Sequence, residues 1–459
     1  MIQGNGPHIG VAASGSFFTY FPMDGRMTAW IGETYTSDVG WELLETLVDV
    51  GNRMAGSEGE RRAAEATRAA LEDVGARNVH LEPFDIQGWT RGSSSIRVDE
   101  NTQECIALPR SPAGEVTGEL VDVGYGLPED FDDDLEGKVV MAASNVPDWY
   151  DRFIHRREKY YYAVEAGAAA FVFRNHVEGC LAPTGSVGTG ESPIGDIPAV
   201  GVSKEVGARL TRRFEGQDVT VSVDADVHDA ESRNVHADLG PDTDEAVLLT
   251  SHVDAHDIAE GAMDNGAGTA VVLEVARALA ARESELDTRV HVVVYGAEEV
   301  GLCGSTHDSE TRDHDDIRAI VNNDGVVRGR TLKFYTHGFD ELDAAATDVA
   351  DRFDHPVVTT PELGPHSDHW PYVQWGVPGY HVMSETDYEG RGWGHTRADT
   401  LDKLEVRDLR EQSILLAELV VHLAREGVEI PHRDPDDIAE QLEAEDLAEG
   451  MKVIGDWPY

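Results

Sequence analysis

The sequence carries very little positive charge. Its 459 residues include 37 Lys and Arg against 87 Asp and Glu, a formal net charge of −50 at pH 7, and only six of the 37 are lysines. Phosphate contacts need basic patches, so no nucleic-acid partner is expected. Self-repulsion at this charge density destabilises a compact chain in dilute buffer, but molar salt screens it. The acidic balance therefore predicts adaptation to a high-salt cytoplasm, as in an extreme halophile, and says little about the chemistry.

Cysteines and long apolar runs are also scarce. Three cysteines are too few, and an odd number, for a disulfide framework. No apolar run reaches the ~18 residues of a membrane span, so no membrane partner is expected. The N-terminus lacks the pattern of a secretory signal, which predicts a cytoplasmic location. The Gly-rich residues 1–26 are expected to be a disordered arm, or sequence upstream of a true start at Met23 or Met27.

In contrast to these scarce features, the sequence predicts a regular alternation of strands and helices. With 41% hydrophobic residues it can bury a large core in more than one domain. The apolar strands expected at 246–250 and 290–295 flank the helical segment 268–282, and a long amphipathic helix at 409–426 closes the pattern. This alternation predicts an α/β fold with a mixed, mostly parallel central sheet and helices on both faces.

Changes in the expected secondary structure and in composition along the chain predict the domain boundaries. Residues 27–112, mostly helical with a strand at 79–84, are expected to form the first part of the main domain. Short strands prevail in residues 113–230, as expected of an inserted β-rich domain. Residues 231–430 are expected to complete the main domain and to carry every motif described below. The acidic tail, residues 431–459, is expected to be a solvated helix or a frayed end.

Five acidic and histidine motifs follow one another in the second part of the main domain, each at the end of an expected strand or the start of a helix. They are His252-Val253-Asp254, Asp264-Asn265-Gly266, Glu298-Glu299, Asn323-Asp324-Gly325, and His395-Thr396 with Asp399 behind it. In an open α/β sheet, ligands bind outside the carboxyl ends of the strands. We therefore expect these side chains to meet in one small volume.

As ligands, the motifs provide two imidazoles and three carboxylates, with one carboxylate left over. Such groups suit zinc, and a pair of zinc ions needs a bridging carboxylate and lowers the pKa of a shared water. The spare carboxylate would accept the proton of that water, and the adjacent Glu298 and Glu299 can divide the two tasks. Asp254 could hold the second ring nitrogen of His252, and Asp399 that of His395. The set predicts a hydrolase that acts through a metal-bound water.

Each motif alone is weak evidence. In so acidic a chain a pair such as Glu298-Glu299 arises by chance, Asp264 can be a helix cap, and an isolated histidine such as His256 is usually structural. The joint occurrence of order, strand-end placement and ligands for two complete metal shells favours the metal site.

The series resembles the co-catalytic zinc aminopeptidases of peptidase family M28, which also contains glutamate carboxypeptidases and glutaminyl cyclases. The matching stretches are Ser251-His252-Val253-Asp254, residues 261–268, residues 297–305, Asn323-Asp324, residues 367–372 and residues 394–400. By position, the resemblance implies that Asp264 bridges two zinc ions. His252 and Asp324 would complete one shell, Glu299 and His395 the other, and Glu298 would be the general base.

The resemblance implies three further features. Cobalt or manganese could replace zinc, and the Asp264-Asn265 peptide bond would be cis. The inserted β-rich block resembles a protease-associated (PA) domain, through residues 135–140, 166–172 and 197–200. Such inserts are thought to shape substrate access.

Two other histidines, His366 and His369, could be mistaken for the second imidazole ligand. His395 is preferred to His366 and His369 because it follows the last strand and has Asp399 as a companion. His369 is expected to shape the substrate pocket, with Tyr372 packed beside it.

The chain is therefore expected to be a dizinc exopeptidase, and first of all an aminopeptidase that uses a zinc-bridging hydroxide with Glu298 as general base. A metallocarboxypeptidase or dipeptidase is the main alternative, and it would need an arginine clamp for the substrate carboxylate. Candidates for that clamp are Arg328, Arg330, Arg391 and Arg397. A non-catalytic binding module and a glutaminyl-cyclase-like acyl transferase are the other classes. Peptides are the expected partners, and the sequence leaves the oligomeric state open.

Overall fold

The computed structural model describes residues 28–131, 134–150, 152–387 and 392–459. The expectations for residues 1–26 and for Arg391 lie outside these ranges. Within them, no helix is both long enough and apolar enough to cross a membrane.

A mixed, mostly parallel sheet forms the centre of the main domain. Its strands lie in the order β13-β12-β14-β11-β9-β10-β8. Three neighbouring pairs in the middle, β14/β11, β11/β9 and β9/β10, are parallel, whereas β12 is antiparallel to β14 and β8 is antiparallel to β10. The bounds are β9 Ala246–His252, β10 Arg289–Tyr295, β11 Ile317–Asn323, β12 Leu332–Tyr335, β13 Val357–Thr360 and β14 Gly379–Ser384. The predicted fold class is confirmed.

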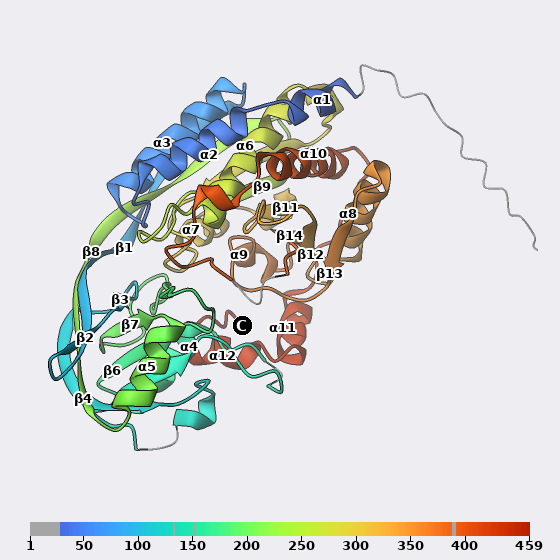
Figure 1. Cartoon of the computed structure of the whole chain (residues 1–459). Helices are drawn as coiled ribbons and strands as arrows, with labels where there is room; N and C mark the ends of the chain where they lie inside the picture. Colours follow the sequence, from blue (N-terminus) through green and yellow to red (C-terminus); the bar gives the residue numbers. More distant parts are fainter. Residues whose placement is uncertain (1–27, 132–133, 151, 388–391) are drawn as a thin grey trace, which may run out of the picture.

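Helices cover both faces of this sheet, because its inner strands are apolar on both sides. Val292 and Val294 of β10 belong to the large cluster beneath α6, whereas Val293 and Tyr295 pack with Tyr372 of α9 on the opposite face. Figure 1 shows α2, α3, α6 and α10 grouped along one side. The helices of the main domain are α1 Ala29–Tyr35, α2 Val39–Val50, α3 Glu58–Asp73, α6 Ala267–Ala280, α7 Cys303–Thr311, α8 Asp340–Phe353, α9 Trp370–Val373 and α10 Val406–Leu423.

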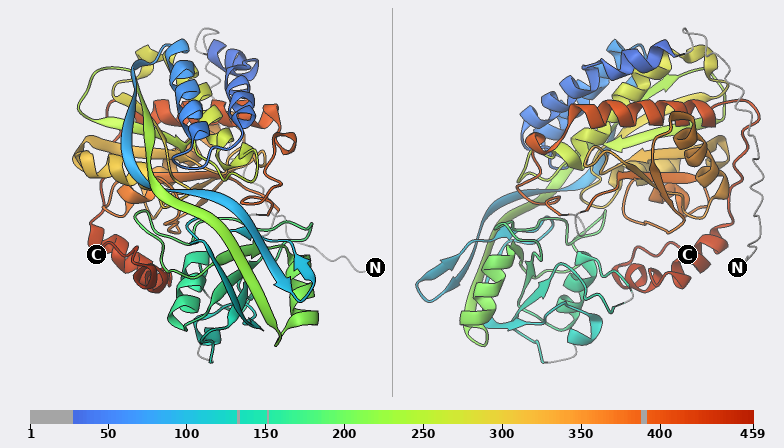
Figure 2. Two further views of the ribbon diagram at one scale, coloured as in Figure 1. Left: turned by 90° about the vertical axis from the view of Figure 1, so that its left-hand side faces the viewer. Right: turned by 45° about the vertical axis from the view of Figure 1, so that its right-hand side comes forward.

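Two long strands connect the main domain with the inserted block. β1 (Arg77–Val98) and β8 (Asp218–Leu239) pair antiparallel along most of their length, as the left view of Figure 2 shows. One end of β8 pairs with β10 of the main sheet, and the other pairs with β4 (Gly114–Asp122) of the insert. A backbone ladder, not a loop, thus joins the two parts. The sequence analysis assigned no strand here, although Val219, Val221, Val223, Ala225 and Val227 alternate with polar residues.

The inserted block is a smaller sheet flanked by two helices. β4, β5, β6 and β7 are parallel neighbours, and β3 closes the sheet antiparallel to β7. The bounds are β3 Ile106–Ala107, β5 Val139–Ala143, β6 Ala170–Arg174, β7 Ala199–Val202, α4 Arg156–Glu165 and α5 Lys204–Phe214, with β2 Asn101–Gln103 pairing with β1. Ser203 caps α5 by accepting a hydrogen bond from the Val206 N–H.

The acidic tail folds as two packed helices, α11 (Pro435–Ala444) and α12 (Ala448–Ile454). The expectation of a solvated or frayed end is corrected here. Asp434 caps α11 and Pro435 opens it, which are strong start signals for a helix. Ile438, Leu442 and Met451 are buried, so the apolar minority of this acidic segment points inward.

We expect Leu442→Ala to lower the free energy of unfolding by about 2–5 kcal/mol, because it leaves a cavity beneath α11. Urea unfolding followed by tryptophan fluorescence measures this. Glu440→Ala, at an exposed position of the same helix, is the matched control. Equal midpoints for the two variants would contradict the packing of α11.

Candidate metal centre

The five motifs meet at the carboxyl edge of the central sheet. His252 is the last residue of β9, Asp324 follows β11 directly, and Glu298 and Glu299 lie on the loop after β10. Asp264 lies in the single π-turn Ala262–Gly266 that opens α6, and His395 lies on the loop after β14. Parallel strands all present their carboxyl ends on one edge, which is why residues this far apart in sequence converge.

The nitrogen and oxygen atoms of these side chains lie close together around Asp264. One of its carboxylate oxygens, Oδ1, is 3.4 Å from His252 Nε2, and the other, Oδ2, is 3.1 Å from His395 Nε2. Asp324 Oδ1 lies 3.7 Å from His252 Nε2, and Glu299 Oε2 lies 3.3 Å from His395 Nε2. The structure therefore forms two groups, one around each imidazole, with Asp264 between them.

These spacings fit ligands of a metal ion. Four ligands at ~2.1 Å from a tetrahedral zinc ion lie about 3.4 Å from one another. His252 Nε2 and Glu299 Oε1 are buried and make no hydrogen bond within the described residues. Buried polar atoms without a partner are rare in folded proteins, and a bound cation would satisfy both.

The backbone presents Asp264 through an unusual local structure. The Asp264-Asn265 peptide bond is cis, as the resemblance implied. The N–H groups of Met263 and Asp264 donate to the two oxygens of Asp399, at 2.8 and 3.1 Å. Asp399 was expected to support His395, but the structure gives its carboxylate this other task. Asp399 thus fixes the loop that carries the central carboxylate.

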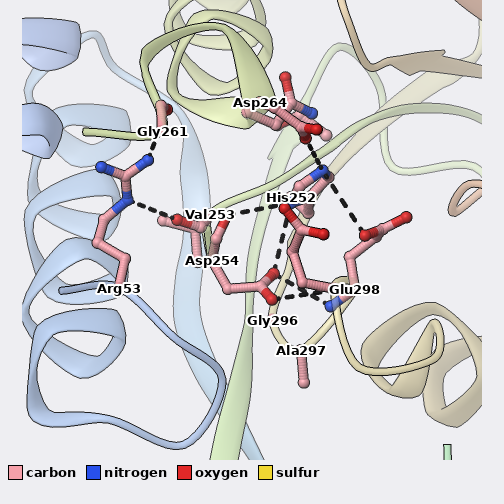
Figure 3. A network of polar contacts seen from close by, with 12 residues as sticks. Arg53, His252, Val253, Asp254, Gly261, Asp264, Gly296, Ala297 and Glu298 are labelled. Carbon is pink, nitrogen blue, oxygen red and sulfur yellow. Dashed lines mark hydrogen bonds and ion pairs between the residues drawn. The ribbon is translucent and has the colours of Figure 1, made fainter. Parts of the chain in front are cut away.

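Asp254 ties two strand ends together. Its carboxylate accepts hydrogen bonds from the backbone N–H groups of Glu298 and Glu299, both at 3.1 Å. His252 Nδ1 lies 3.2 Å from the Asp254 backbone oxygen and 3.4 Å from Oδ1 (Figure 3). Asp254 therefore orients both the imidazole and the Glu298-Glu299 pair. Ala297, the residue directly before Glu298, has a left-handed φ of +56°. Such a strained backbone conformation is typical of functional sites.

Two buried residues of the N-terminal segment support the site, and the sequence reasoning missed both. Arg53 donates to the backbone oxygens of Val253 and Gly261, at 3.0 and 2.8 Å, so it clamps the two loops that carry ligands (Figure 3). Glu60 accepts hydrogen bonds from the Ala297 N–H and the Ser232 hydroxyl. Arg53 lies in a Gly-flanked turn, which was the only sequence signal for it.

Burial shifts the pKa values of these carboxyl groups strongly. It raises the pKa of Glu299 to about 7, with the charge of Asp264 adding to the effect. Burial also raises the pKa of Glu298 well above its ordinary value. At Asp264 burial acts in the same direction, but the imidazoles of His252 and His395 beside its carboxylate outweigh it and lower the pKa. The protein alone thus confines more negative charge than it neutralises, which divalent cations would correct.

Comparisons with known proteins agree with this geometry. Residues 234–420 match the model of Peptidase family M28, and residues 116–210 match that of the PA domain. Residues 234–420 therefore carry a domain of peptidase family M28. The matched part of the peptidase contains all five motifs, and the matched PA domain lies within the inserted block.

The peptidase is similar to proteins of two activities. Aminopeptidase YwaD of Bacillus subtilis (strain 168) is 26% identical over 88% of this chain and 87% of its own length. Carboxypeptidase Q of Bos taurus is 25% identical over 80% of this chain and 82% of its own. The solved structure of an aminopeptidase from Aneurinibacillus sp. strain AM-1 is 27% identical, with a TM-score of 0.66 over 88% of this chain and 99% of that one.

His256 is a third residue of the site that the sequence reasoning missed. It was expected to be structural, but its Nε2 lies 2.9 Å from Glu299 Oε2 and its ring packs edge-on against His395. Together His256, Glu299 and His395 could hold a metal ion, as could His252, Glu298 and Asp324. The only sequence signal for His256 was its position two residues after Asp254.

A cavity of about 330 Å³ opens onto the site. Glu298, Glu299 and His395 form its floor, and Trp370 and Pro371 of α9 form part of its wall. His369 and Tyr372, expected to shape this pocket, are fully buried instead. Residues three apart lie on the same face of a helix, and here that face packs against the core. The Tyr372 hydroxyl donates to Asp308 there. The pocket expectation for these two residues is therefore corrected.

The candidate arginine clamps lie away from this cavity. Arg330 pairs with Glu411, Arg397 donates to the Cys180 backbone oxygen, and Arg328 lies over the ring of Trp393. None of these three lines the cavity. Two other arginines do, Arg156 and Arg157 of the insert.

We expect Asp399→Asn to weaken zinc binding by about 10–100-fold, because an amide cannot accept both backbone N–H groups that fix Asp264. Titration of the metal-free peptidase against a competing chelator measures this affinity. Asp402→Asn, three residues away and exposed, is the control. An unchanged affinity in Asp399→Asn would show that the contact does not position the ligand.

Proposed function

We propose that this peptidase is a zinc-dependent aminopeptidase that removes residues from the N-terminus of peptides. One observation carries the proposal: two imidazoles and three carboxylates converge with ligand spacing while Glu298 stays beside them at the cavity floor. A binding module that had lost its metals would have no reason to retain this complete set.

Two zinc ions per chain suit the arrangement. Asp264 turns one oxygen toward each imidazole, as a bridging carboxylate must. Asp324 lies beside His252, and Glu299 lies beside His395, so each ion would gain one further carboxylate. Cobalt or manganese could occupy the same ligands, since both accept imidazole and carboxylate.

Glu298 is the proposed general base. When bound, the metal ions lower the pKa of a water toward neutrality and polarise the substrate carbonyl. Glu298 would accept the proton of that water and pass it to the leaving amine. Its position fits this task, because the side chain lines the cavity and Oε2 lies 4.0 Å from His252 Nε2. Asp254 holds its backbone in place.

The charges around the cavity favour a free amine over a free carboxylate. Glu298 is a carboxylate at the floor that stays outside the two proposed metal shells, so it can attract an α-ammonium group. Among the described residues, both arginines that line the cavity are already engaged. Arg157 pairs with Asp456, and Arg156 donates to the Ser186 backbone oxygen at 2.9 Å. A carboxypeptidase needs a clamp that is available to the substrate.

The aminopeptidase proposal predicts hydrolysis of an amino-acid anilide, and none of an N-blocked dipeptide, by the zinc-loaded enzyme. Because the net charge is −50, the assay should be run in molar salt, which also examines the proposed high-salt cytoplasmic setting. Chelation should abolish the activity, and zinc should restore it. Cleavage of the N-blocked dipeptide alone would point to a carboxypeptidase.

Glu298→Gln should keep two zinc ions per chain and lose activity by a factor of about 10²–10⁴, because it removes the proton acceptor and leaves the ligands. Metal analysis and anilide hydrolysis, side by side, measure both quantities. Glu310→Gln, at an exposed position of α7, is the control. Full activity in Glu298→Gln would overturn the assignment of the base.

A further inference from the structure

The C-terminal residues 451–458, which we call the strap, form a wall of the substrate cavity. Met451, Gly455, Asp456, Trp457 and Pro458 line the same cavity as Glu298, Glu299 and His395. The strap lies beyond residues 234–420, the part of the chain that matches the peptidase family. It is therefore an addition to the site that the family motifs do not account for.

The strap is fastened to the inserted block on one side. Arg157 of α4 pairs with Asp456, and Arg152 pairs with both Glu158 and, at 3.7 Å, Glu449 of α12. Arg152 and Glu158 are both buried, so this pair fixes Arg152 in place, while its contact with Glu449 lies at the surface. Figure 1 shows α12 beside α4, below the main domain.

On the other side the strap is fastened to the main domain. The Tyr459 hydroxyl donates to the Gln374 backbone oxygen at 2.6 Å, next to the wall formed by α9. Ahead of the strap, the Leu363 N–H donates to Glu445, and the Arg433 N–H donates to the Gly376 backbone oxygen. The right view of Figure 2 shows the C-terminal helices below the main domain and to the side of the insert. Two domains thus hold the strap across the end of the cavity.

The cavity is closed on a third side by a contact across the domains. His155, just before α4, stacks on His366 of the main domain with ring centroids 5.3 Å apart, and both line the cavity. A volume of about 330 Å³ is at the small end of the range for ligand pockets. A peptide bound with its α-amine at the metal floor therefore meets the strap within a short distance.

We propose that the strap limits the length of peptide that the enzyme accepts, with Trp457 as the specificity-determining residue. The inference rests on the proposed aminopeptidase function, because it takes the substrate N-terminus to lie at the metal floor. Trp457 and Pro458 present an apolar surface where the remainder of the peptide must pass. Short peptides fit in front of it, and longer ones must displace it.

The test compares kcat/KM for an unblocked hexapeptide and an unblocked dipeptide with the same N-terminal residue. Wild type should prefer the dipeptide. Trp457→Ala should raise the hexapeptide-to-dipeptide ratio by about 10-fold, the size of effect that one pocket contact supplies. Asp456→Ala, which breaks the pair with Arg157, should shift the ratio in the same direction.

The matched controls are Trp149→Ala, a 67%-exposed tryptophan of the insert that does not line the cavity, and Asp436→Ala on the exposed side of α11. Both should leave the ratio unchanged. An unchanged ratio in Trp457→Ala and Asp456→Ala, or an equal loss on both peptides, would overturn the proposal and leave the strap a structural role. If Trp457→Ala does not fold, Asp456→Ala alone decides.

Binding separates this proposal from the proposed function. The dissociation constants of the two peptides, measured by calorimetry in a Glu298→Gln background with and without Trp457→Ala, report the strap without turnover. If wild type cleaves neither peptide, the aminopeptidase proposal fails, while the ratio of dissociation constants still decides whether the strap restricts length. A ratio that does not change when Trp457 is removed would reject the strap as a limit.

Discussion

The gathering of buried carboxylates in one small volume is the constraint to which the rest of this site responds. Asp254, Asp264 and Glu299 are all less than a tenth exposed, and taking each such charge out of water costs several kcal/mol after relaxation. The protein offsets part of this cost with backbone N–H groups, as at Asp254, and with imidazoles, as at Asp264. Bound cations would offset the rest of this desolvation cost. This explains why the metal ligands and the residues that support them lie so close together here.

Holding these charges in position takes parts of the chain that lie far from them in sequence. Arg53, fully buried, joins the loop after β9 to the loop before α6 through backbone oxygens alone. Burial lowers its pKa to about 10, which still leaves the guanidinium charged at neutral pH. Asp399 fixes the Asp264 loop from the other side. The ligands are thus held by a shell of contacts, and such shells govern metal affinity as strongly as the ligands do.

The inserted block and the C-terminal helices take part in the site, not only in the surroundings. β8 runs as one strand from the main sheet into the insert, so the two parts are joined by a backbone ladder. His155 and Arg157 of this block line the cavity, and Arg157 pairs with Asp456 of the strap. Three separate parts of the chain therefore line the cavity. The two relatives of opposite specificity, an aminopeptidase and a carboxypeptidase, are consistent with this view, because the metal motifs alone do not choose between them.

The sequence by itself determined the α/β fold class and the convergence of His252, Asp264, Glu299, Asp324 and His395, because alternating apolar strands and strand-end motifs obey local rules that survive folding. The adjacency of Glu298 and Glu299 indicated that one could bind metal and the other act as base, and the family resemblance assigned the base to Glu298. Tertiary structure alone decided that His256, Arg53 and the strap lie at the site, and it turned His369 and Tyr372 into the core. These depend on which face of a helix or loop packs against a distant neighbour, and neither spacing nor composition encodes that choice.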